Sequence, residues 1–199
     1  MSIRLVCSVL CTVICAGILM LGLGSQDGIA ADKDRELLPV VDGWIIDQSP
    51  FDGVGDGVVT DQFDTVFLNA GIAEARAAME FDLSRINPHR IKSATLRITN
   101  FGTGILPGTL TIPVQVMGYA GDGVIQNDDF DAGTLVTVFD TFATPDRVPI
   151  NIDVTEFLQG VHPSEHIVGF NLRTTVHGTQ VNYGSLEMED PPTLIITLK

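Results

Sequence analysis

Cysteine is confined to the start of this chain, and this limits how the rest can be stabilised. The three cysteines, Cys7, Cys11 and Cys15, all stand before position 16. None of them follows the small residue that a lipoprotein cleavage site requires, so lipidation is a minor alternative. Because the remaining chain has no thiol, no disulfide framework holds it together. Its stability must come from the packing of a hydrophobic core.

Basic residues are also scarce. The chain has 11 Lys and Arg against 25 Asp and Glu, which gives a formal net charge of -14 and a pI near 4.3. A surface of this sign repels phosphate backbones and anionic lipid headgroups. The charge therefore excludes nucleic acid as an expected partner. It leaves calcium, or another hard cation, as the ligand that clustered carboxylates favour.

Catalytic motifs are missing as well. The sequence has no G-x-S-x-G elbow, no H-E-x-x-H pair, no phosphate loop and no dinucleotide fingerprint. His162 and His166 have the spacing of zinc ligands on a helix, but Pro163 and Gly160 disfavour a helix there. We therefore expect no enzyme, with a polysaccharide hydrolase or lyase as a minor alternative.

One long apolar run is present, at the N-terminus. Arg4 precedes residues 5–23, which are almost wholly apolar, and small residues at Gly28 and Ala30 follow. This pattern predicts a hydrophobic signal helix in residues 1–30, with cleavage before Ala31. The run is long enough for an uncleaved membrane anchor, which needs about 20 apolar residues. Either alternative places the rest of the chain outside the cytoplasm, secreted, extracellular or periplasmic.

Residues 75–101 show the clearest periodicity in the chain. Apolar residues alternate with others in residues 75–84, and again in residues 94–99. A period of two predicts strands with one face on a core and one in water. Residues 72–83 would also give a helix an apolar stripe, but Phe81 belongs only to the alternating pattern. We therefore expect two adjacent strands of a β-sandwich core.

Short alternating segments continue to the C-terminus, and turn residues separate them. One helix signal interrupts them, where Asp153 can cap, Glu156 follows three residues later and Gly160 can end the helix. Residues 31–41 read as a loose charged leader. The sequence thus predicts an all-β, two-sheet jelly-roll β-sandwich with one short helix, in a single domain over residues 42–199.

Several short motifs resemble those of the DNRLRE-type modules, which are secreted bacterial β-sandwich domains related to disaggregatase-associated and carbohydrate-binding modules. The motifs are residues 77–84, 91–98, 152–156 and the closing residues 185–194. The resemblance covers residues 42–199 and implies a jelly-roll sandwich for which sugar binding is the usual proposed role. This chain departs from the family in standing without an enzyme domain and in its long acidic loops. Arg76 is expected to pair with Glu187 or Asp82 inside the sandwich.

Two kinds of residue are candidates for binding. The Asp- and Gly-rich loops could supply oxygen ligands to a structural calcium ion, although neither has the EF-hand spacing, and Asp-Gly pairs also simply make turns. A sugar would need an exposed aromatic ring with polar neighbours, and aromatic residues make up only 7% of the chain. The aromatic candidates are Trp44, Tyr119 and Phe130, of which the latter two, beside an acidic loop, are expected to be the more exposed. The calcium candidates are Asp52, Asp56 and Asp61 in one loop and Asp122, Asp128, Asp129 and Asp131 in the other.

Together these features predict a monomeric, non-catalytic extracellular module that binds carbohydrate or another surface polymer through loops at one end of the sandwich. The alternative is a structural or adhesive protein of the cell surface that contacts other proteins. A membrane is a partner only if the N-terminal segment stays uncleaved.

Overall fold

The computed structural model describes residues 34–48, 52–60, 63–69, 73–105, 111–142 and 147–199. These residues belong to one compact unit, Asp32–Lys199. The predicted signal segment, residues 1–30, lies outside the described residues, so its fate stays a prediction. No helix in the described ranges has the length and apolar character needed to cross a membrane.

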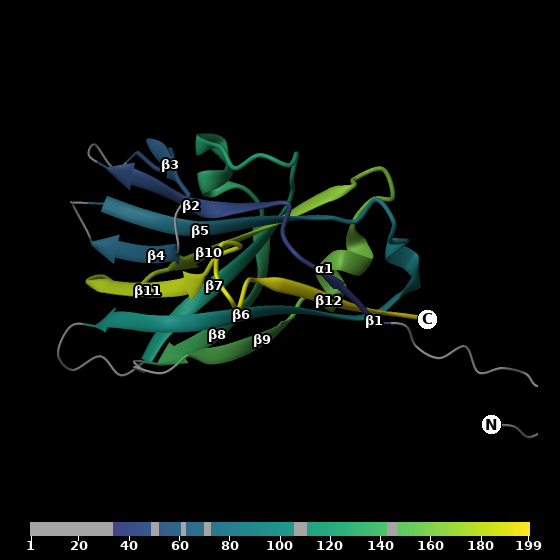
Figure 1. Ribbon diagram of the computed structural model, residues 1–199. Helices are drawn as coiled ribbons and strands as arrows, with labels where there is room; N and C mark the ends of the chain where they lie inside the picture. Colours follow the sequence, from purple (N-terminus) through teal and green to yellow (C-terminus); the bar gives the residue numbers. More distant parts are fainter. Residues whose placement is uncertain (1–33, 49–51, 61–62, 70–72, 106–110, 143–146) are drawn as a thin grey trace, which may run out of the picture. The chain divides into compact units, whose positions relative to one another are not determined.

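The described chain consists of strands with three short helical segments (Figure 1). In chain order the elements are β1 (Asp34–Leu37), β2 (Val41–Gln48), β3 (Gly57–Val59), β4 (Phe63–Asn69), β5 (Ala73–Asp82), the 3-10 helix η1 (Pro88–Arg90), β6 (Ile91–Ile105), β7 (Thr111–Ala120), the 3-10 helix η2 (Asn127–Asp131), β8 (Thr134–Phe142), β9 (Val148–Asp153), α1 (Thr155–Gly160), β10 (Ile167–Thr174), β11 (Thr179–Gly184) and β12 (Thr193–Leu198).

The strands form two antiparallel sheets. The first has the order β3-β2-β5-β10-β7-β8. The second is built around the long strand β6, with β9 along one edge and β11 and β12 along the other. Strand β1 lies outside β12, and β4 lies outside β11. Because β4 also pairs with the start of β5, it joins the two sheets at one side. The predicted all-β sandwich with one short helix is confirmed.

The core lies between β5 and β6, which belong to opposite sheets. Met79 and Phe81 of β5 and Leu96 and Ile98 of β6 have no exposed surface, as the period of two predicts. Phe81 also packs edge-to-face on Phe170 of β10, with ring centroids 6.1 Å apart. Each fully buried side chain of this size contributes about 1.5–3 kcal/mol. The two segments that dominate the sequence pattern therefore face each other and do not pair as neighbours.

The charged segment expected to be a loose leader is partly a strand. Asp34–Leu37 forms β1, which pairs with Thr197–Leu194 of β12. The Thr197 hydroxyl donates a hydrogen bond of 2.7 Å to Asp34 Oδ1. Charged side chains are common on exposed edge strands because they discourage pairing with other chains. In the described residues the sandwich therefore includes β1, which precedes the expected boundary at residue 42.

The alternating pattern predicts that the outer face of β5 is exposed to water, but the structure shows that it is covered. Residues 121–133, the acidic loop between β7 and β8, fold over this face. Ile125 and Phe130 from the loop pack on Ala78 of β5 and Ile45 of β2 to form a small second core. Residues 121–133 therefore form a third layer on the outer face of the first sheet.

Candidate functional site

The acidic residues of the first loop are occupied by hydrogen bonds within the loop. Asp52 Oδ1 accepts from the backbone N–H of Val54 at 3.1 Å, and Asp56 Oδ2 accepts from that of Gln48 at 2.6 Å. Asp61 lies outside the described residues. These contacts are typical of Asp residues that stabilise turns.

The second acidic loop follows the same pattern. Asp122 Oδ1 accepts from Val124 N–H at 3.0 Å, and Asp129 Oδ2 accepts from Gln126 N–H at 2.8 Å. Asp128 is exposed. Among the described residues, no three His, Cys, Asp or Glu side chains come together as metal ligands would. Calcium binding stays a prediction, and the hydrogen bonds favour the alternative that these loops make ordinary turns.

The two aromatic residues expected to be exposed are buried, which corrects that expectation. Tyr119 is 6% exposed, and its ring lies against Gly169, where no side chain intervenes. Phe130 is 1% exposed and lies beneath the guanidinium of Arg76, which is 3.9 Å from its ring centroid. Neither ring offers a face on which a sugar could stack. Trp44 is half-buried on β2, and its role as a platform stays a prediction.

Arg76 organises the third layer, and sequence reasoning assigned it the wrong partners. Its Nε donates to Glu74 Oε1 at 2.6 Å, and its Nη1 donates to Phe130 O at 2.6 Å and to Asp131 Oδ1 at 3.0 Å. Asn171 Nδ2 donates to Phe130 O as well, at 3.1 Å. Arg76 does not pair with Glu187 or Asp82. Its outward position on β5 turns it toward the loop instead of the sandwich interior.

Two buried carboxylates hold the loops over this sheet. Glu80 Oε2 accepts from Gly123 N–H at 2.6 Å, and Asp47 Oδ2 accepts from Gly53 N–H at 3.0 Å. Burial raises the pKa of both groups, and neighbouring Asp charges raise it further. Since each carboxylate fixes a turn, these groups are part of the scaffold.

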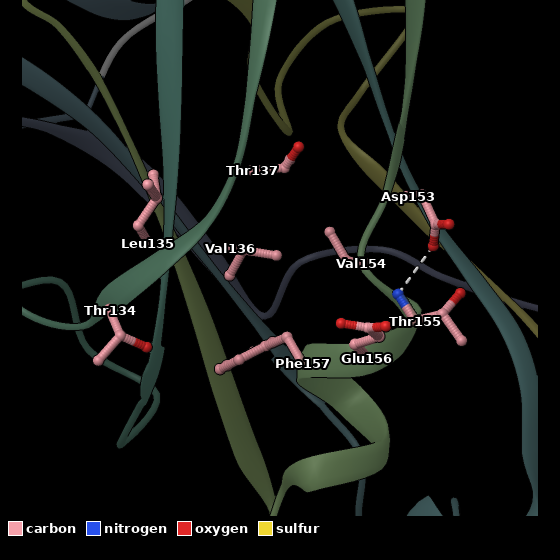
Figure 2. A pocket seen from close by; sticks show the side chains of 9 residues that line it. All are labelled: Thr134, Leu135, Val136, Thr137, Asp153, Val154, Thr155, Glu156 and Phe157. Atoms are coloured by element: carbon pink, nitrogen blue, oxygen red, sulfur yellow. Dashed lines mark hydrogen bonds between the residues drawn. The ribbon is translucent and has the colours of Figure 1, made fainter.

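The open region of the sandwich lies between its edge strands β8 and β9. At one end the sheets are closed by Asn100, whose Nδ2 donates to the Thr141 hydroxyl at 2.7 Å. Toward the other end a groove of about 470 Å³ separates Thr134–Thr137 of β8 from Asp153–Phe157, where β9 leads into α1. Figure 2 shows Val136 and Phe157 extending into this space from opposite walls. The volume falls within the range of about 300–1,000 Å³ found for ligand sites.

The turn before α1 sets the second wall of the groove. Asp153 Oδ1 accepts from Thr155 N–H at 2.9 Å, the contact drawn in Figure 2. The Thr155 hydroxyl oxygen accepts from Ala94 N–H at 2.9 Å, which ties the helix start to β6. The helix signal in the sequence is thus confirmed, although Val154 occupies the N-cap position and Asp153 acts from the residue before it.

Packing against the core fixes the position of Phe157 in the groove wall. Its ring packs edge-to-face on Phe170, with centroids 5.4 Å apart. A Cβ added at Gly118 of β7 would approach the Phe157 ring to 2.6 Å, so the glycine makes room for it. The ring is therefore fixed by the core while part of it stays accessible.

Comparison with known proteins gives only a distant likeness. No protein-family model matches this chain, and no curated protein sequence matches it. Among solved structures it is similar to a xylan-binding module, CBM15, with a TM-score of 0.39 and 12% identity over 84% of this chain and 97% of that chain. A likeness of this size does not bear on ligand or site. The resemblance to DNRLRE-type modules stays a prediction.

The chemistry of the groove combines an apolar floor with a polar rim. Val136, Val154 and Phe157 form the floor, and Thr134 and Thr137 of β8 line one wall, whereas the Thr155 hydroxyl is bonded to the backbone of Ala94. The carboxylates of Asp153 and Glu156 are exposed at the rim. The hydroxyl and N–H of Thr155 lower the pKa of Asp153, so this group is ionised at neutral pH. The groove therefore presents hydrogen-bond acceptors above an apolar surface.

Sequence reasoning identified none of the residues that line this groove as ligand-binding. It treated Asp153 and Glu156 as helix-capping residues, and it read residues 135–140, one of the short alternating segments, as an ordinary strand. The missing information was the topology, because the two walls come from elements that do not pair with each other.

Proposed function

We propose that this protein is an exported, non-catalytic module that binds a neutral polysaccharide in the groove between β8 and α1. The observation that carries the proposal is the groove itself, which has an apolar floor, threonine side chains in its β8 wall and two carboxylates at its rim. Export rests on the N-terminal sequence pattern.

A sugar unit matches this arrangement in two respects. Its hydroxyl groups can donate to carboxylate oxygens and exchange hydrogen bonds with threonine hydroxyls, and its C–H faces can lie on apolar side chains. Phe157 supplies the aromatic contact that such a face favours. Asp153 and Glu156 would repel an anionic polymer, which is why the proposal is restricted to neutral glycans.

A second candidate function, contact with another protein, is favoured by a different observation. Strand β8 lies at the edge of its sheet, and Leu135, Val138 and Phe142 on it are 55%, 48% and 60% exposed. Apolar side chains on an open edge strand are a typical site for pairing with another chain. This alternative corresponds to the adhesive protein expected from sequence.

Binding of the purified domain to an array of neutral and acidic glycans tests the proposal. We expect retention of neutral glycans by the wild-type domain and loss of retention in Glu156→Gln and Phe157→Ala variants. Asp128→Asn, which removes an exposed carboxylate from the loop over the other face of the first sheet, is the matched control and should bind normally. Retention of no glycan, together with self-association or capture of a defined surface protein, would support the second candidate. Release of reducing ends would instead identify a hydrolase.

A further inference from the structure

A second hollow lies directly beyond the groove. It has a volume of about 290 Å³, and its lining includes Gly160, Val161 and Glu165 together with the end of β7. Glu156 and Phe157 line both hollows, so they form a shared boundary. The two spaces therefore lie one after the other along α1.

The second hollow shares two features with the first, apolar side chains and exposed carboxylates. Val161 is buried in its lining, Phe157 is common to both hollows, and the carboxylates of Glu156 and Glu165 are exposed at its rim. No Lys, Arg or His is among the residues that line either hollow. A repeated pattern of apolar floor and carboxylate rim suits a ligand whose own chemistry repeats.

We infer that the ligand is an internal stretch of a neutral glycan chain, with successive sugar units occupying the two hollows. This inference rests on the proposed function and extends it from sugar binding to recognition of a chain. Both hollows are bordered by exposed side chains, so a chain can enter from the side and continue along α1, away from the end that Asn100 closes. A site for a single terminal sugar would need one enclosed pocket.

Gly160 provides a way to test the second hollow alone. A Cβ added there meets no atom within 4 Å, so a side chain at this position begins in open space. Because Gly160 lines the second hollow, Gly160→Leu adds a branched apolar side chain beside it, and Gly160→Ala is the matched control at the same position.

The experiment measures affinity for neutral glucose- and xylose-based saccharides of one to six units by titration calorimetry. We expect the six-unit chain to bind at least about tenfold more tightly than the single sugar, a difference of about 1.4 kcal/mol. Gly160→Leu should abolish this gain by weakening binding of the longer chains, and Gly160→Ala should behave as wild type. Equal affinity for short and long chains, or an unaltered gain in Gly160→Leu, would overturn the inference and leave sugar binding intact. Failure of every oligosaccharide and polysaccharide to bind would overturn the proposed function, and the inference with it.

Discussion

Replacing Asp42 by Asn should stabilise this protein at neutral pH. Asp42 is 5% exposed on β2, and its Oδ2 accepts a hydrogen bond of 2.6 Å from the N–H of Leu186, in the connection between β11 and β12. Burial, together with the charge of Glu187, raises the pKa of this carboxyl to about 6, even though the hydrogen bond from Leu186 N–H lowers it. The side chain thus joins the two sheets through a hydrogen bond but carries an unfavourable charge at pH 7.

The magnitude follows from the difference between the folded and unfolded pKa. Each pKa unit corresponds to about 1.36 kcal/mol, so a rise from 3.8 to about 6 makes the ionised Asp42 carboxyl unfavourable by about 3 kcal/mol. A raised carboxyl pKa means that the folded state binds the proton more tightly. The stabilisation that comes from this tighter proton binding is complete below pH 4 and is lost as the pH rises through 6. The Asn side chain keeps an acceptor for Leu186 N–H and has no such charge.

Urea denaturation of wild type and Asp42→Asn between pH 4 and pH 8 measures this difference. We expect similar free energies of unfolding near pH 4 and a gap that grows to about 3 kcal/mol above pH 7 in favour of the variant. Asp128→Asn removes an exposed charge and controls for the change in net charge. The reasoning is refuted if the gap between wild type and Asp42→Asn is the same at every pH, or if it opens toward low pH.

Three further results are expected. Gly118→Ala should lower the free energy of unfolding by about 1–3 kcal/mol in urea denaturation, because its Cβ would overlap the Phe157 ring, and Phe157→Leu should relieve part of this loss. Arg76→Met should cost about 3–5 kcal/mol in the same assay by leaving the largely buried Glu74 carboxylate, 14% exposed, without its partner. Adding Glu74→Gln should recover part of this loss, and equal losses in both variants would argue against the pairing. Thermal unfolding in millimolar calcium and in chelator should give the same midpoint temperature, because the carboxylates of the acidic loops already accept hydrogen bonds in turns. A higher midpoint temperature in calcium would support the metal site predicted from sequence.

The sequence predicts the strands of the sandwich because each strand is indicated by the pattern of residues within its own segment. Alternation of Met79 and Phe81 with polar neighbours identifies β5, and Leu96 and Ile98 identify β6, without knowledge of any partner. The short helix is also predicted from nearby residues. The pairing of strands is harder to predict. Strands β5 and β6 are consecutive in the chain but do not pair with each other, and their partners include β10 and β12 near the C-terminus.

The third layer shows what alternation alone misses. Arg76 and Glu80 have the sequence pattern of an exposed face, but residues 121–133 cover them. The available signal was the pair of apolar residues Ile125 and Phe130 within an otherwise acidic loop. Such residues need a surface on which to pack, and the outer face of β5 provides it.

The groove is missed for a further reason, which also explains its rigidity. Its walls, Thr134–Thr137 and Asp153–Phe157, become neighbours only because β7 and β6 carry β8 and β9 to the same side of the sandwich. Asn100 closes one end of this side, and Phe157, packed on Phe170, holds α1 in place at the other. Core contacts thus fix both walls before any ligand arrives. A preformed groove needs little ordering when it binds, so most of the contact energy of a glycan would contribute directly to affinity.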